Sequence, residues 1–220
     1  LNYSTELPIQ PIARNQERDL PLSFAQQRLW FLDQLEPNNP FYNIPKAIRL
    51  NGNLNIQILE QALDAIVAHH EILRTNYICK NGNPIQVIAA PQSVQLQIID
   101  LQEYEKAERE TQVQTILQQE SQRPFNLASD MMLRCCLLHL GLTEYVLLLV
   151  MHHIASDGWS MGILWSQLTQ LYKAFKIGKP NPLTKLPIQY ADYAVWQRKW
   201  LTGEVLERQL NYWKQQLAQE

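Results

Sequence analysis

Two apolar segments joined by a short turn constrain the fold of this chain most strongly. Residues 133–140 and 145–152 are each long enough for a strand, and only residues 141–144 separate them. Neither segment alternates apolar with polar side chains, as a strand with one solvated face does. The sequence therefore predicts two adjacent central strands that form a hairpin buried on both faces.

Helical periodicity and shorter strand-like segments surround this hairpin. Ser23 followed by Gln26 is a capping-box pattern that begins a helix, and Asn-Gly-Asn at 81–83 predicts a tight hairpin turn. We expect helices over 23–35, 55–70, 103–122, 159–175, 188–200 and 204–219, and strands over 44–50, 73–79, 85–89 and 94–99. The chain is thus of the α/β class, with a mixed, largely antiparallel sheet covered by helices.

The chain is long enough for one domain with a sizeable core. Of its 220 residues, 46% are hydrophobic and 18% charged, a balance that excludes a disordered tail. Residues 1–20 are polar and contain Pro8 and Pro11, so we expect them to be a linker or the segment leading into the domain. The remaining residues, 21–220, form the predicted domain.

Charge and cysteine content narrow the partners and the compartment. Lys and Arg number 19 against 21 Asp and Glu, so no clustered positive charge favours nucleic acid. The strongest apolar run, 145–151, is too short to cross a bilayer, and no secretory signal is visible, so no membrane partner is expected. Cys79, Cys135 and Cys136 are an odd set with an adjacent pair, which indicates small buried side chains in a reducing cytoplasm.

The segment from His152 to Gly158 carries the most chemistry. Two histidines end an apolar strand, and Asp157 and Gly158 follow where a helix is expected to begin. Successive strand side chains face opposite ways, so one imidazole can face a channel while the other points inward. The pair can be two satisfied core histidines or an acid–base site. A metal site is disfavoured, because adjacent histidines diverge and no third strong ligand is near.

Four segments, in order, resemble motifs of one protein family. Residues 152–158 match HHxxxDG, and residues 23–32 resemble the opening motif SxAQxRLWFL. Residues 70–75 (His-Glu-Ile-Leu-Arg-Thr) and 190–197 (Tyr-Ala-Asp-Tyr-Ala-Val-Trp-Gln) resemble the second and fourth motifs. The chain thus resembles the N-terminal half of a condensation domain of nonribosomal peptide synthetases, with a fold similar to chloramphenicol acetyltransferase.

The resemblance implies a function and a set of partners. It implies amide bond formation between a carrier-bound acyl or peptidyl thioester donor and an aminoacyl thioester acceptor, of the type that joins an L-donor to an L-acceptor. Donor and acceptor peptidyl carrier proteins, the C-terminal half of the domain and neighbouring synthetase domains are the implied partners. The phosphopantetheine arms belong to the carriers, so no cofactor is expected on this chain. The fragment by itself is expected to be inactive and to be able to dimerise.

The resemblance also implies roles for individual residues. His153 is the catalytic residue, while His152, Asp157, Gly158 and Arg74 support it, with Asp157 paired to Arg74. Backbone N–H groups near Gly158 would steady a developing oxyanion. Two other functions stay open: an epimerisation domain of the same superfamily, and a non-catalytic module that docks carrier proteins.

Overall fold

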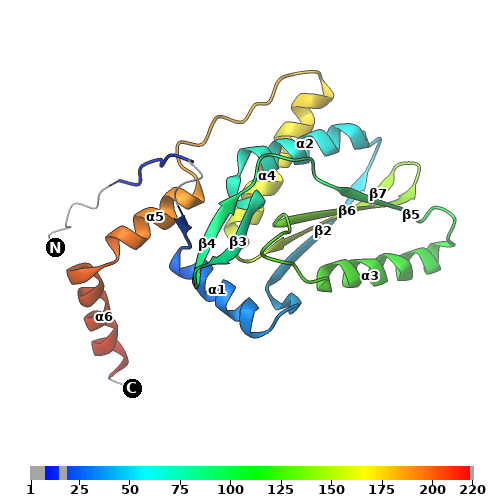
Figure 1. Cartoon of the computed structure of the whole chain (residues 1–220). Helices are drawn as coiled ribbons and strands as arrows, with labels where there is room; N and C mark the ends of the chain where they lie inside the picture. The colour runs from blue at the N-terminus through cyan, green and yellow to red at the C-terminus, as the bar shows by residue number, and fades with distance from the viewer. Residues whose placement is uncertain (1–7, 15–18, 219–220) are drawn as a thin grey trace.

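A four-stranded sheet forms the centre of the molecule, which the computed structural model describes over residues 8–14 and 19–218 (Figure 1). The strand order is β2-β7-β6-β5. These strands are β2 (Asn43–Asn51), β5 (Leu96–Asp100), β6 (Leu133–Gly141) and β7 (Glu144–His152). All neighbours are antiparallel except β5 and β6, which are parallel, so the predicted mixed and largely antiparallel sheet is confirmed.

The β6–β7 hairpin is buried on both faces, as the two apolar segments predicted. One face packs under α2 (Ile56–His69) and α4 (Gly158–Lys176), and the other lies over α3 (Lys106–Gln122) (Figure 1). Cys135 belongs to the first core and Cys136 to the second, because adjacent strand side chains point to opposite faces. Cys79 is exposed, contrary to expectation, because it lies near the tip of a hairpin.

That hairpin belongs to a second sheet that the sequence pattern did not separate from the first. Its order is β1-β4-β3, with β1 (Leu20–Pro21), β3 (Thr75–Lys80) and β4 (Asn83–Ile88). The two turn residues, Asn81 and Gly82, both have positive φ, 52° and 78°. This backbone is what a tight hairpin needs, and it explains the Asn-Gly pair.

The helices begin where side chains satisfy their free N–H groups. α1 (Phe24–Leu35) starts at the predicted capping box, in which Ser23 and Gln26 bond reciprocally. Two short 3₁₀ helices, η1 (Pro40–Tyr42) and η2 (Glu71–Arg74), precede β2 and β3. Because η2 includes Leu73 and Arg74, the strand expected from residue 73 starts at Thr75. α5 (Tyr190–Trp200) and α6 (Gly203–Leu217) end the described chain, and no described α6 residue is buried.

Part of the segment expected to be a linker is held against the domain. Ile12 N donates to Asp192 Oδ1 at 2.9 Å, and Arg14 bonds the same oxygen at 2.7 Å and Glu71 at 2.8 Å. Leu20 already belongs to β1. Residues 1–7 and 15–18 of that segment lie outside the described residues. Within the described part of the chain, no helix is long and apolar enough to span a membrane.

Candidate active site

The turn that follows β7 separates the two histidines. His152 is the last residue of β7 and lies opposite Asn43 of β2. The backbone N–H of His153 donates to the carbonyl oxygen of Tyr42 at 2.8 Å, so the pairing with this edge of the sheet continues one residue past the strand. The side chain of His152 is buried, whereas that of His153 is exposed.

His152 lies in an aromatic environment that keeps it neutral. Its ring meets the rings of Tyr42 and Phe125 edge-on, with centroids 6.2 Å and 5.8 Å away. Burial, followed by the nearby charges of His153 and Arg134, lowers the pKa of His152 to about 4. Its Nδ1 accepts a hydrogen bond from the backbone N–H of Ile154 at 3.1 Å. The neutral ring therefore carries its proton on Nε2 and shapes the turn that bears His153.

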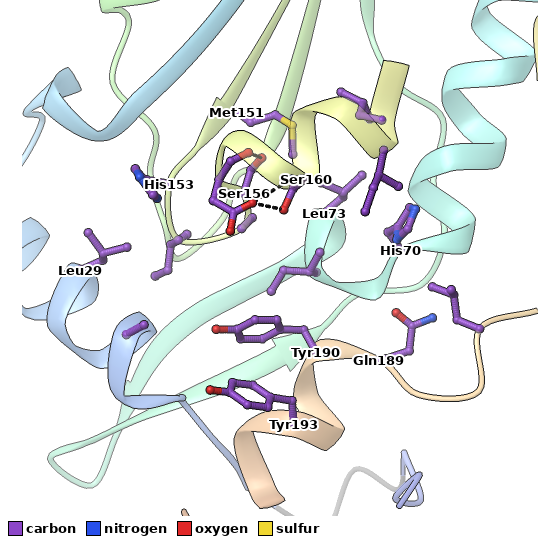
Figure 2. Close-up of a pocket in the computed structure, with 18 of the residues that line it drawn as sticks. Leu29, His70, Leu73, Met151, His153, Ser156, Ser160, Gln189, Tyr190 and Tyr193 are labelled. Atoms are coloured by element: carbon purple, nitrogen blue, oxygen red, sulfur yellow. Dashed lines mark hydrogen bonds between the residues drawn. The ribbon is translucent and has the colours of Figure 1, made fainter. Parts of the chain in front are cut away.

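His153 lines an open pocket of about 540 Å³ (Figure 2). Leu29 from α1, Leu73 from η2 and Met151 from β7 contribute apolar wall. Tyr190 and Tyr193 from α5 form the opposite side, and Figure 2 shows their rings stacked one above the other along the helix. An apolar pocket with a few polar groups is the usual form of a small-molecule site.

Asp157 acts at the start of α4 and does not pair with Arg74. Its Oδ1 accepts hydrogen bonds from Ser160 N at 2.8 Å and Ser160 Oγ at 2.6 Å. The hydrogen bond from the Ser160 side chain, then that from its backbone, lowers the pKa of Asp157. The Arg74 guanidinium donates to the carbonyl of Ala89, and its Nε is buried without a hydrogen-bond partner in the described structure.

The expected Asp157–Arg74 ion pair is therefore absent from the described residues. The reason is local: an exposed aspartate at a helix start satisfies the free N–H groups of the first turn. Gly158, the first residue of α4, has no positive φ, and a methyl group there would meet nothing within 4 Å. The tight turn at this point thus does not require glycine.

Other polar residues of the pocket were not assigned to it from the sequence. Tyr190 Oη lies 3.1 Å from Ser23 Oγ, which joins the start of α5 to the start of α1. His70 Nε2 lies 2.6 Å from Gln167 Oε1 and also faces the pocket. All of them except Gln167 belong to motif segments, so the sequence identified the segments but not their shared cavity. No group of three or more His, Cys, Asp or Glu side chains among the described residues is arranged to hold a metal.

A helix-covered mixed sheet that presents an exposed imidazole to an apolar pocket can support acid–base chemistry on a bound substrate. A family model of the condensation domain matches residues 16–220, and the chain belongs to that family. A linear gramicidin synthase of Brevibacillus parabrevis is 48% identical over 210 residues, which is 96% of this chain and 4% of that protein. Malpinin synthetase of Mortierella alpina is 42% identical over 215 residues, 98% of this chain and 3% of that protein. The chain therefore spans a small part of these relatives.

Solved structures show the same fold. The X-domain in its complex with OxyB from teicoplanin biosynthesis has a TM-score of 0.85 at 29% identity, over 97% of this chain and 46% of that chain. The starter condensation domain of rhizomide synthetase RzmA has a TM-score of 0.81 at 21% identity, over 91% of this chain and 48% of that chain. In each case the chain corresponds to about half of the solved chain.

Proposed function

We propose that this chain is the N-terminal half of a domain that forms amide bonds in nonribosomal peptide synthesis. The amine of an aminoacyl thioester on an acceptor carrier protein attacks the carbonyl carbon of an acyl or peptidyl thioester on a donor carrier. A C–N bond forms, the C–S bond breaks, and the donor carrier leaves as a thiol after taking up the proton that the amine releases. The L-donor to L-acceptor type is part of the proposal, as is a cytoplasmic location.

The exposed ring of His153 in the pocket is the observation that carries this proposal. A positioned imidazole can accept the amine proton as it is lost, or hydrogen-bond the amine and orient it, and either role places it beside the attacking nitrogen. A general base contributes about 10²–10⁴-fold in rate, and holding two tethered substrates in attacking geometry can contribute more. The thioester is already activated, so positioning is a large part of the task.

Supporting residues act through the turn and the helix start. His152 holds the turn through Ile154, and Asp157 holds the first turn of α4. Free N–H groups near Gly158, at the positive end of the α4 dipole, would stabilise the oxyanion that forms on the thioester carbonyl. In this proposal the carriers supply the phosphopantetheine arms, the domain uses no cofactor of its own, and the C-terminal half closes the other side of the channel.

The test is product formation by the complete domain with both loaded carriers. We expect His153→Ala to lose most of the turnover while its circular dichroism spectrum and melting temperature stay those of the wild type. His69→Ala is the matched control, because His69 lies in the neighbouring helix and does not line the pocket. Near-normal turnover by His153→Ala would remove the catalytic role of this residue.

A binding-only function is the second candidate. The structural likeness to the X-domain favours it, since that domain is known in complex with another protein, OxyB. The same assay separates the candidates: a docking module binds carriers or other proteins without product in the wild type. An epimerisation domain would instead invert the α-carbon of a carrier-bound residue, which chiral analysis of the released product detects.

A further inference from the structure

The C-terminal end of α3 is tied to the strands that end at the histidine pair. α3 lies on the face of the sheet opposite α2 and α4 (Figure 1). Asn43 Nδ2 donates to Ser121 O at 2.7 Å and Arg123 O at 2.9 Å, and Arg134 donates to Pro124 O at 2.9 Å, Glu120 O at 3.4 Å and Arg123 O. Side chains from β2 and β6 thus satisfy carbonyl groups that a helix end leaves free.

Arg134 also clamps an aromatic ring against His152. Its guanidinium carbon lies 3.8 Å from the centroid of the Phe125 ring, a cation–π contact. The Phe125 side chain is buried and meets the His152 ring at 5.8 Å with an interplanar angle of 72°. Arg134 Nε is buried without a hydrogen-bond partner in the described part of the chain, so the contacts of its Nη atoms and the ring hold the guanidinium in place.

Both arms of this arrangement end at the backbone around His153. On one side Asn43 follows Tyr42, whose carbonyl accepts the N–H of His153 at 2.8 Å. On the other side Phe125 packs on His152, whose Nδ1 accepts the N–H of Ile154 at 3.1 Å. The amide before the His153 side chain and the amide after it are therefore both held by residues that contact the α3 end.

We propose that Asn43 and Arg134 are positioning residues for His153, which they act on by joining the end of α3 to β2 and β6. They keep Phe125 packed on His152 and so fix the turn that presents the His153 ring to the pocket. The inference rests on the proposed catalytic role of His153. A displacement of ~1 Å at a reacting group can cost about 10²-fold in rate, so such support matters to turnover.

The charge of Arg134 supports the same arrangement. It is one of the causes, after burial and the charge of His153, that lower the pKa of His152 to about 4. A protonated His152 would carry a proton on Nδ1 and lose the hydrogen bond from Ile154. Burial lowers the pKa of Arg134 itself to about 10, which still leaves it charged at neutral pH.

The experiment compares Arg134→Met, Arg134→Lys and Asn43→Ala in the complete domain, with Arg123→Met as control. Arg123 belongs to the same helix end, but its side chain is half exposed and forms an ion pair with Glu120 at 3.1 Å. Two quantities are measured: kcat and KM with loaded carriers, and hydrogen exchange at the His153 and Ile154 amides. We expect Arg134→Met to lower kcat about tenfold or more with KM little changed, and to speed exchange at both amides. Arg134→Lys and Asn43→Ala should give smaller effects in the same direction, and Arg123→Met none.

Each outcome decides the inference. Unchanged kcat with unchanged amide protection in Arg134→Met overturns it, and so does a fall in kcat without faster exchange at the two amides. If Arg134→Met does not fold, Arg134→Lys and Phe125→Leu carry the test, and wild-type exchange in both overturns the inference. If the wild-type domain makes no product, the proposed function fails, while the exchange measurement still tests the positioning.

Discussion

His152 and His153 are neighbours in sequence, yet their rings lie in opposite environments: His152 is 3% exposed among aromatic side chains, and His153 is exposed in the pocket. The end of β7 produces this divergence, because consecutive strand residues face opposite ways. The buried ring can then shape the turn while the exposed ring meets substrate. Their substitutions should consequently affect different properties.

Stability should depend on His152 and not on His153. Replacing His152 with Ala leaves the Ile154 N–H without its acceptor and opens a space beside Phe125. An unsatisfied buried donor costs about 1–3 kcal/mol, and the lost packing adds to this. His153→Ala should stay within about 0.5 kcal/mol of the wild type, as surface substitutions do. Urea denaturation of both variants measures the difference, and equal losses would contradict the assignment of the buried ring.

Acid should weaken the fold through His152. Its pKa is about 4 in the folded protein against 6.5 for an ordinary histidine. Between these values the unfolded chain binds a proton that the folded protein refuses, so the free energy of unfolding falls as pH drops from about 6.5 to about 4. The full effect of this one group is about 3 kcal/mol, as an order of magnitude.

The measurement is the free energy of unfolding against pH for the wild type and His152→Asn. Carboxylates with a lowered pKa, such as Asp192, also weaken the fold in acid, so the difference between the two proteins isolates the imidazole. The advantage of the wild type should shrink across this window. His153→Ala, the control, should keep the wild-type profile, and a difference that does not change with pH would show that His152 is not held neutral.

Asp157→Ala should cost only what a helix cap is worth. The carboxylate bonds Ser160 N and Oγ, and losing such a cap typically costs about 1 kcal/mol, or about 2–4 °C in melting temperature for a chain of this size. Asp157→Ser and Asp157→Asn, which preserve the cap, should stay near the wild type. A loss of about 3–5 kcal/mol would instead indicate a buried ion pair with Arg74.

This chain by itself should fold without catalysing condensation. The two cores around the β6–β7 hairpin support folding, but the chain covers only 46% of the X-domain structure that it matches. We expect no product from the fragment with loaded carriers, and product when the separately expressed C-terminal half is added. Product from the fragment alone would show that a complete site lies within it.

The same fragment should self-associate. Several large apolar side chains of α6 are exposed, namely Leu210, Tyr212, Trp213 and Leu217. Exposed apolar surface of this kind favours association between copies. Sedimentation velocity should show a concentration-dependent dimer, and adding the C-terminal half should replace that dimer with a one-to-one complex. A fragment that stays monomeric at high concentration would contradict this expectation.

Local signals predicted much of this fold. The Ser23–Gln26 capping box, the Asn-Gly turn at 81–82 and the central β6–β7 hairpin all lie where the sequence placed them. Each depends on a few neighbouring residues or on periodicity along one element. The predicted Arg74–Asp157 pair was wrong because Asp157 is used by Ser160, three residues away. A local cap satisfies that carboxylate without any distant partner.

The order of residues along the chain was enough to predict most helices and strands, the central position of β6 and β7, and the chemical importance of the segment from His152 to Gly158. Backbone conformation and apolar periodicity are properties of consecutive residues, so they can be read along the chain. The folded arrangement was needed to show that Tyr190 and His153 line one pocket, and that Asn43 and Arg134 hold the end of α3 beside His152. These contacts join residues far apart in sequence, and their geometry exists only once the sheet and its helices have packed.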